Sequence, residues 1–222
     1  MGKSLTGFIS TGIAGISFLL IFIAFATPNW LETDNKLHNP KFQRIGLWWV
    51  CFSNFQDPHY WYDTKFQNCW WIFEEEYYII FDFLLPGFFV AVQFFFTVCF
   101  VFHLIAIPST LLYLACSREN YRFVHLLIVL GKFSILLERI CGTIAVYIFG
   151  AYGDGRDWMP NWEHNHIGWS YALAVIGVIG SYTAGILFLI EARRHKIKRK
   201  KAEKMHAAYH MEALKAGMQS NI

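Results

Sequence analysis

Residues 46–51, Gly46-Leu47-Trp48-Trp49-Val50-Cys51, decide the fold because of where they stand in the chain. They lie between two long apolar segments, residues 4–31 and 83–117, which contain no Asp, Glu, Lys or Arg. A membrane-spanning helix needs about 20 mostly apolar residues, so each segment is long enough for one span. The motif therefore belongs to a loop that joins two spans, and Trp30 and Cys69 lie in the same loop.

Two more apolar segments complete a four-span plan. Residues 164–190 contain no Asp, Glu, Lys or Arg, and residues 123–150 are apolar apart from His125, Lys132, Glu138 and Arg139. The composition agrees, because 55% of residues are hydrophobic and 16% are charged, whereas soluble domains carry about 25% charged residues. We predict outer loops at 28–85 and 150–166, and spans over residues 7–27, 86–114, 123–149 and 167–190.

The first apolar segment allows two interpretations. Ala24-Phe25-Ala26 has the small-residue pattern of a signal-peptide cleavage site. However, the uninterrupted run Leu5–Ala26 is longer than the apolar region of a signal peptide, which usually has about 7–15 residues. We therefore expect the segment to be kept as the first span.

Lysine and arginine residues predict the orientation, because they accumulate on the cytoplasmic side of a membrane. The tail, residues 191–222, has nine basic and three acidic residues, a net charge of +6. Residues 28–82 have four basic and eight acidic residues, a net charge of −4. We expect both termini and the loop between the second and third spans in the cytoplasm, and the loops 28–85 and 150–166 outside. The chain then divides into a four-span domain, residues 1–190, and a basic cytoplasmic tail, residues 191–222.

The first outer loop has the pattern of a small antiparallel sheet. Turn-forming pairs such as Asn-Pro and Asp-Pro separate short aromatic and β-branched runs at residues 42–45, 46–52, 60–62 and 66–73. Disulfides persist outside the cell, so we expect Cys51 and Cys69 to be bonded. A closed loop of about 18 residues contributes about 3 kcal/mol by chain entropy. The predicted fold is an α-helical membrane protein, a four-transmembrane-helix bundle with a small extracellular antiparallel β-sheet stapled by one disulfide.

The loop also carries a family signature. Its residues resemble the W-GLW-C-C signature of the claudin family, within the peripheral-myelin-protein/claudin group, at Trp30, Gly46, Leu47, Trp48, Cys51 and Cys69. The two cysteines enclose 17 residues, whereas claudins of tight junctions usually have about half as many. The sequence Glu74-Glu75-Glu76-Tyr77-Tyr78 stands where those claudins carry a basic residue. The chain is therefore most similar to divergent invertebrate claudin-like proteins of septate junctions.

The resemblance implies a fold and a function. The fold would be a left-handed four-helix bundle beneath an extracellular sheet. The protein would be a structural cell–cell junction protein of the plasma membrane, at lateral contacts, that helps form a paracellular barrier by lateral self-association and trans contacts with the next cell. An auxiliary four-span subunit of a channel or receptor is the alternative, because relatives with GLW and the cysteine pair also do that work. The sequence does not distinguish a paracellular barrier from a paracellular pore.

The sequence contains no catalytic constellation. No Ser/His/Asp order, Cys-x-x-Cys pair, phosphate-binding loop or carboxylate dyad stands out. We therefore expect no enzymatic activity, no cofactor and no nucleic-acid partner. Glu163, His164 and His166 have metal-binding side chains, but one short spacing in a loop favours a solvated segment over a metal site.

The tail and the second span carry candidate attachment sites. Ser220-Asn221-Ile222 fits a PDZ ligand, in which the free carboxylate is held by backbone amides. Cys116 is a candidate for palmitoylation, or else a buried thiol. A basic run is expected to hold the tail against anionic lipid, at about 1 kcal/mol per residue near the surface; its members are Arg193, Arg194, Lys196, Lys198, Arg199, Lys200 and Lys201.

The third predicted span has one polar face. His125, Lys132 and Arg139 recur every seven residues, so they drift only about 20° per step around a helix. We expect Lys132 near mid-bilayer, with Gln93, His103 or backbone carbonyls as candidate partners, and Arg139 near the outer surface.

Small residues spaced by four allow close helix approach. They occur at Gly7, Thr11 and Gly15 and again at Gly177, Ser181 and Gly185. This spacing favours packing inside the bundle over a dimer face.

Overall fold

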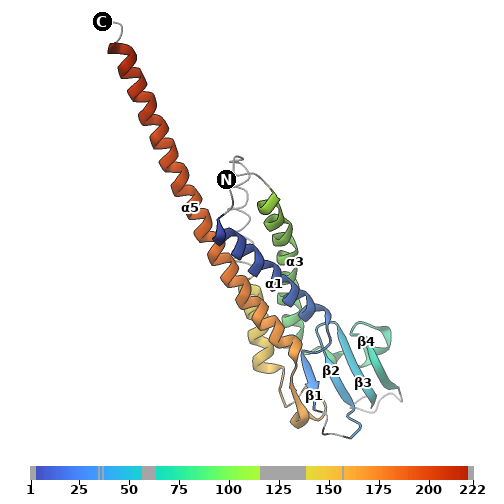
Figure 1. Cartoon of the computed structure of the whole chain (residues 1–222). Coiled ribbons are helices and arrows are strands. Elements are labelled where there is room, and N and C mark those ends of the chain that lie inside the picture. The colour runs from blue at the N-terminus through green and yellow to red at the C-terminus, as the bar shows by residue number, and fades with distance from the viewer. Residues whose placement is uncertain are drawn as a thin grey trace.

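The structure is a computed structural model that describes residues 4–34, 36, 38–56, 64–115, 139–156 and 158–219. Three of its helices are long and apolar enough to cross a membrane: α1 (Leu5–Ala26), α3 (Gly87–Ala115) and the first part of α5 (Trp169–Gln219). A shorter apolar helix covers Arg139–Tyr152. The helices form a bundle with a sheet at one end and the long α5 projecting from the other end (Figure 1).

The helices α1 and α3 lie where the sequence predicts spans over 7–27 and 86–114. Ser4 caps α1, because its hydroxyl oxygen accepts a hydrogen bond from the Gly7 amide at 3.2 Å. Pro86 precedes α3, and its carbonyl oxygen accepts hydrogen bonds from the next turn, from the amides of Phe89 and Val90. Most of the third predicted span, with His125 and Lys132, lies outside the described residues.

The fourth predicted span, 167–190, is only the beginning of α5. This helix continues without a break through the predicted tail to Gln219, over 51 residues. The boundary between span and tail at residue 190 is therefore a change of composition, and the backbone conformation does not change there.

The sheet has five antiparallel strands in the order β4-β3-β2-β1-β5. Their bounds are β1 Leu31–Thr33, β2 Phe42–Ile45, β3 Trp49–Gln56, β4 Lys65–Trp71 and β5 Asn165–Ile167. The sequence predicts β2, β3 and β4 but not β1 or β5. The strand β5 comes from the second loop, so the sheet joins the two loops into one layer.

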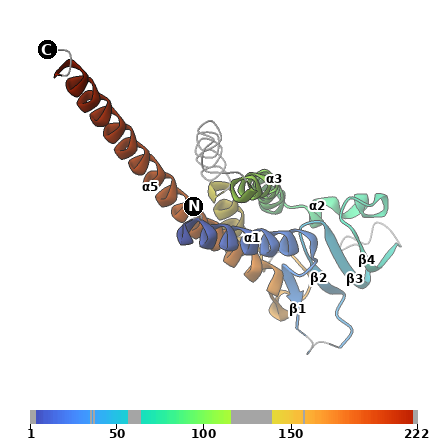
Figure 2. The same cartoon turned by 45° about the horizontal axis from the view of Figure 1, so that its top comes forward.

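The sheet packs against a short helical segment on its buried side. This segment consists of the 3₁₀ helix η1 (Glu75–Ile80) and the helix α2 (Phe81–Leu84). Tyr77 of η1 is buried against β3 and β4, with its ring 4.9 Å from the Phe66 ring and 6.1 Å from the Phe52 ring, centroid to centroid. Figure 2 shows α2 between the sheet and α3. Aromatic stacking of this kind holds the sheet against the chain that leads into α3.

Small residues of α5 allow it to pack closely on its neighbours. A Cβ atom at Gly177 would lie 2.7 Å from Ile21 Cγ1 of α1, and one at Gly180 would overlap the Ser17 hydroxyl. Within α1, Gly7 lies against the Tyr113 hydroxyl, whereas Gly15 has no described atom within 4 Å of the Cβ position. The small residues of α5 thus pack inside the bundle, and Gly7 of α1 does so as well.

Candidate functional site

The tryptophan of the motif connects the helix ends. Trp30 is fully buried, and its ring contacts three rings at centroid distances of 5.1, 4.9 and 5.7 Å: Phe96 of α3, Phe149 of the helix Arg139–Tyr152 and Tyr171 of α5. Its Nε1 donates a hydrogen bond to the Ala24 carbonyl oxygen of α1 at 2.7 Å. One side chain thus fixes four helices relative to one another at the sheet end of the bundle.

Glycine is required at position 46 by a close approach of two backbone segments. A Cβ atom there would overlap the Thr27 carbonyl oxygen and lie 2.6 Å from Pro28 Cα. Hydrogen bonds on each side fix this crossing, because the Trp30 amide donates to the Ile45 carbonyl oxygen at 2.9 Å and the Gly46 amide donates to the Trp49 carbonyl oxygen at 2.8 Å. The chain that leaves α1 therefore runs directly against the β2–β3 turn.

Leu47 and Trp48 attach the same turn to α3 and α1. The Leu47 carbonyl oxygen accepts a hydrogen bond from Gln93 Nε2 of α3 at 2.7 Å, and both residues are buried. The ring of Trp48 lies 5.4 Å from that of Phe25 in the last turn of α1. Gln93, which the sequence offers as a candidate partner of Lys132, thus donates to the GLW motif. Lys132 itself lies outside the described residues.

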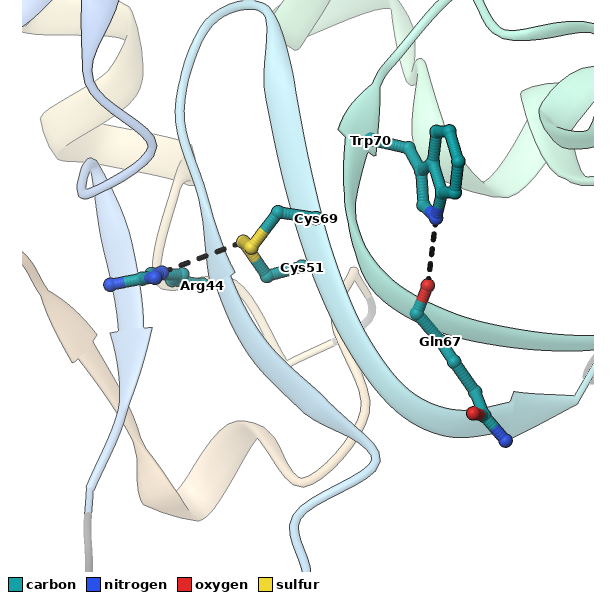
Figure 3. The surroundings of a disulfide bond; sticks show 5 residues. All are labelled: Arg44, Cys51, Gln67, Cys69 and Trp70. Atoms are coloured by element: carbon teal, nitrogen blue, oxygen red, sulfur yellow. Dashed lines mark hydrogen bonds between the residues drawn. A yellow bond between two sulfur atoms is a disulfide. The ribbon is translucent and has the colours of Figure 1, made fainter.

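The disulfide joins the edge strand β4 to its neighbour β3 (Figure 3). Cys51 of β3 and Cys69 of β4 are bonded and face each other in register, with Cα atoms 4.0 Å apart. Arg44 Nε donates to Cys51 Sγ at 3.5 Å from the neighbouring strand β2. Trp70 points away from the bridge, and its Nε1 donates to the Gln67 carbonyl oxygen at 2.8 Å. The bridge therefore links the edge strand β4 covalently to β3, which the motif holds on the bundle.

The second loop is tied to the first by β5 and by the residues that follow it. The Gly168 amide donates to the Trp30 carbonyl oxygen at 2.9 Å, and a Cβ atom at Gly168 would overlap the Asn29 carbonyl oxygen. His164 Nδ1 lies 3.3 Å from the nearer carboxylate oxygen of Asp34. Desolvation raises the pKa of Asp34. Hydrogen bonds from the His164 side chain and the Lys36 amide lower it, as do the positive charges of the His164 and Lys36 side chains, and together they outweigh desolvation, so the pKa of Asp34 is lowered. This pair closes the far end of the β1–β5 contact.

A large aromatic surface remains exposed beyond these anchors. Trp49 and Trp71 face each other across β3 and β4 and are 43% and 46% exposed. The Trp71 ring meets that of Phe73 at 5.3 Å, and Phe73 is 40% exposed. We call Trp49, Trp71 and Phe73 the aromatic patch. Buried Trp30 and Trp158 belong to the core, so the tryptophans of the two loops divide between core and surface.

The family follows from the whole membrane domain. A model of PMP-22/EMP/MP20/claudin tight-junction proteins matches residues 15–190, from within α1 to within α5. The chain belongs to this family. The matched region contains the Trp30 anchor, the GLW turn and the disulfide. No curated protein matches the chain.

Membership in the claudin group has direct consequences. The protein is a multi-pass membrane protein with three described helices that can cross a bilayer. The family is structural and non-enzymatic, and it suggests a role in junctions or membrane structure. The sequence names the six residues of the signature, but it could not show the contacts of Gln93, Gly168 and Tyr171 with this loop, because each contact joins distant segments.

Arg139 corrects an expectation about depth. The sequence places it near the outer surface, but it is buried in the bundle, and its Nη2 donates to the Ser181 carbonyl oxygen at 2.8 Å. Ser181 lies 12 residues after Trp169, the first residue of α5. At 1.5 Å per residue, the two residues are about 18 Å apart along the helix axis. Counted back from the end of the described helix at Tyr152, Arg139 lies about 20 Å inside the bundle, so the expected position near the outer surface was wrong.

The other predicted attachment sites are placed only in part. The basic run Arg193–Lys201 lies on α5, where the side chains of its Arg and Lys residues are exposed. Cys116 and Ser220-Asn221-Ile222 lie outside the described residues, so their roles remain predictions.

Proposed function

We propose that the protein is a structural component of lateral cell–cell junctions that helps to form a paracellular barrier. In this proposal the sheet faces the space between cells and both termini are cytoplasmic. Copies associate side by side in the membrane and contact proteins of the next cell through the sheet. Membership in the claudin group supports this role, as does the −4 charge of the first loop against the +6 of the tail.

The rigid attachment of the sheet to the bundle carries the proposal. The GLW turn is fixed by the Gly46 crossing and by the Gln93–Leu47 hydrogen bond of 2.7 Å. The disulfide continues this attachment from β3 to β4. A preorganised surface loses little conformational entropy when it binds, so a sheet at a fixed angle is suited to repeated contacts between copies.

The aromatic patch is the surface that we propose for these contacts. Its three members are all at least 40% exposed, and tryptophan is enriched among the residues that dominate binding energy at interfaces. It adjoins β4, which is an edge strand of the sheet. Such an edge has backbone groups available for pairing with another chain.

Expression in cells that lack junctions tests the proposal. The wild-type protein should collect at cell–cell contacts, lower the leakage of a paracellular tracer and form intramembrane strands. The double variant Trp49→Ser/Trp71→Ser should reach the surface with its disulfide intact but lose enrichment at contacts. Trp162→Ser is the matched control, because Trp162 is 38% exposed but lies outside the patch, stacked on Arg156. A uniform distribution of the wild-type protein over the cell surface would contradict the proposal.

The alternative, an auxiliary subunit, makes a different prediction in the same cells. An auxiliary subunit should co-purify with a larger channel or receptor and should form no strands alone.

Two attachments in the cytoplasm belong to the same proposal. The C-terminal Ser220-Asn221-Ile222 would bind a PDZ scaffold, and deletion of these three residues should abolish scaffold pull-down. The basic residues nearest the membrane, Arg193, Arg194 and Lys196, would bind anionic lipid headgroups, because their distance from the bilayer is short.

A further inference from the structure

The long helix α5 carries the predicted tail away from the membrane. If Trp169 marks one face of the bilayer, as an interfacial tryptophan does, a hydrocarbon layer of about 30 Å ends near Phe188. The helix then continues to Gln219. No Pro or Gly occurs between Glu191 and Ala216, so the sequence offers none of the usual causes of a sharp bend. Figure 1 shows this part of α5 projecting beyond every other element.

Polar contacts hold the helix where it leaves the bundle. Glu191 is 3% exposed, and its Oε1 lies 2.9 Å from His195 Nε2 one turn further on. Arg194 Nη1 donates to the Thr6 hydroxyl of α1 at 2.8 Å. The Arg194 contact joins the first turn beyond the span to the start of α1, and the Glu191–His195 pair lies within α5 beside it.

The basic residues of the tail fall into two groups according to their distance from the bilayer. Arg193 lies about 8 Å beyond Phe188, within the headgroup layer, whereas Lys201 and Lys204 lie about 20 and 24 Å beyond it. Attraction to a charged membrane surface falls off within about one Debye length, which is about 8 Å at physiological ionic strength. The bilayer therefore attracts the first group strongly and the second group little.

The basic residues far from the bilayer, Lys201 and Lys204, lie beside a row of exposed apolar side chains, which we call the apolar ridge. Ile197, Met205 and Tyr209 lie along one row of residues spaced by four, with Lys201 between them, and such a row forms a ridge on a helix. Their side chains are 56%, 59% and 70% exposed. Every side chain from Lys196 to Ala213 is exposed, and the only acidic residue among the basic ones, Glu203, is paired with Arg199 at 2.7 Å.

We infer that residues 197–211 form a docking helix for an acidic cytoplasmic protein that has an apolar groove. An apolar ridge with basic neighbours matches such a groove, since helix-in-groove binding buries apolar anchors while charges pair at the rim. The membrane is a poorer partner, because the ridge points into water at a distance that the bilayer does not reach. The inference rests on the orientation in the proposed function.

Calcium-loaded calmodulin is a suitable probe, because it is acidic and exposes a methionine-rich apolar groove. The full chain in phosphatidylcholine nanodiscs should bind it with a Kd of about 1 µM or below. The variant Met205→Gln/Tyr209→Gln should weaken binding at least about tenfold. The matched control Ala207→Gln/His210→Gln changes exposed residues on the opposite face and should leave binding unchanged.

Three outcomes would overturn the inference. The first is that calmodulin does not bind the chain in phosphatidylcholine nanodiscs. The second is that the ridge variant and the control variant weaken calmodulin binding equally. The third is protection of Lys200–Lys204 from trypsin by added phosphatidylserine without any protein, which would identify the membrane as the partner. Failure of the wild-type protein to collect at cell contacts would instead contradict the proposed function and leave this inference standing. A tail epitope that is accessible in unpermeabilised cells would refute the orientation and the inference together.

Discussion

The guanidinium group of Arg139 occupies the space that a side chain would fill at Gly185 of α5. Its Nη2 donates to the Ser181 carbonyl oxygen at 2.8 Å, and its carbon atom Cζ lies 5.1 Å from the centroid of the Tyr182 ring. A buried charge inside a span is costly unless polar partners surround it. Glycine at position 185 is therefore a condition for burying Arg139 between two helices.

Gly185→Ala should destabilise the bundle. The new methyl group would overlap the Arg139 guanidinium, and overpacking of this kind costs about 1–3 kcal/mol. The matched control is Gly12→Ala in α1, where no described atom lies within 4 Å of the new Cβ. Because Ala favours a helix over Gly by about 1 kcal/mol, the control should unfold at the same or a higher temperature. Equal thermal shifts for the two variants in detergent would contradict this account.

Gly46→Ala should loosen the sheet from the bundle. Its methyl group would meet the backbone of Thr27 and Pro28, which cannot move without disturbing the Trp30 anchor. We expect a loss of at least about 2 kcal/mol, in the range of overpacking in a core. Gly87→Ala is the control, because no described atom lies within 4 Å of a Cβ atom there. Limited proteolysis of the first loop would measure the effect, and unchanged protection would speak against it.

Cys51→Ser should cause misfolding and retention inside the cell. The bridge contributes about 3 kcal/mol by chain entropy, and its loss frees β4 at the edge of the sheet. Cys69→Ser and the double variant should behave alike, because each lacks the same bond. Surface biotinylation compares them with Cys141→Ala, which removes a buried free thiol. Normal surface delivery of Cys51→Ser would show that the bridge is dispensable.

Tyr77→Phe should stabilise the ectodomain at high pH. Burial, together with the charge of Glu76, raises the pKa of Tyr77 to about 12 from its usual 10.0. The folded state therefore resists ionisation, and stability should fall as the pH rises from about 10 to about 12, because only the unfolded chain ionises readily. The hydroxyl has no hydrogen-bond partner in the described structure, so its removal should also be neutral or favourable at pH 7. Chemical denaturation at both pH values tests this, and a loss of stability at pH 7 would indicate an unseen partner.

Sequence alone could predict features that depend on neighbouring residues. The spans can be predicted from the sequence because transfer into lipid depends on about 20 consecutive side chains. The helices α1 and α3 lie where the hydropathy places them. The bond between Cys51 and Cys69 follows from two cysteines in one loop. The family signature is likewise local, because Gly46, Leu47 and Trp48 are adjacent.

Only the tertiary structure decided how distant segments meet. The strands β1 and β5 have three residues each, too few for a periodic pattern, and they exist because they pair with each other across more than 130 residues of chain. Hydrogen-bond partners such as Gln93 for Leu47 and Ser181 for Arg139 are chosen by packing, which no local pattern encodes. The net positive charge of the tail can be counted in the sequence. The distance that the tail extends from the membrane depends on α5 remaining helical to Gln219.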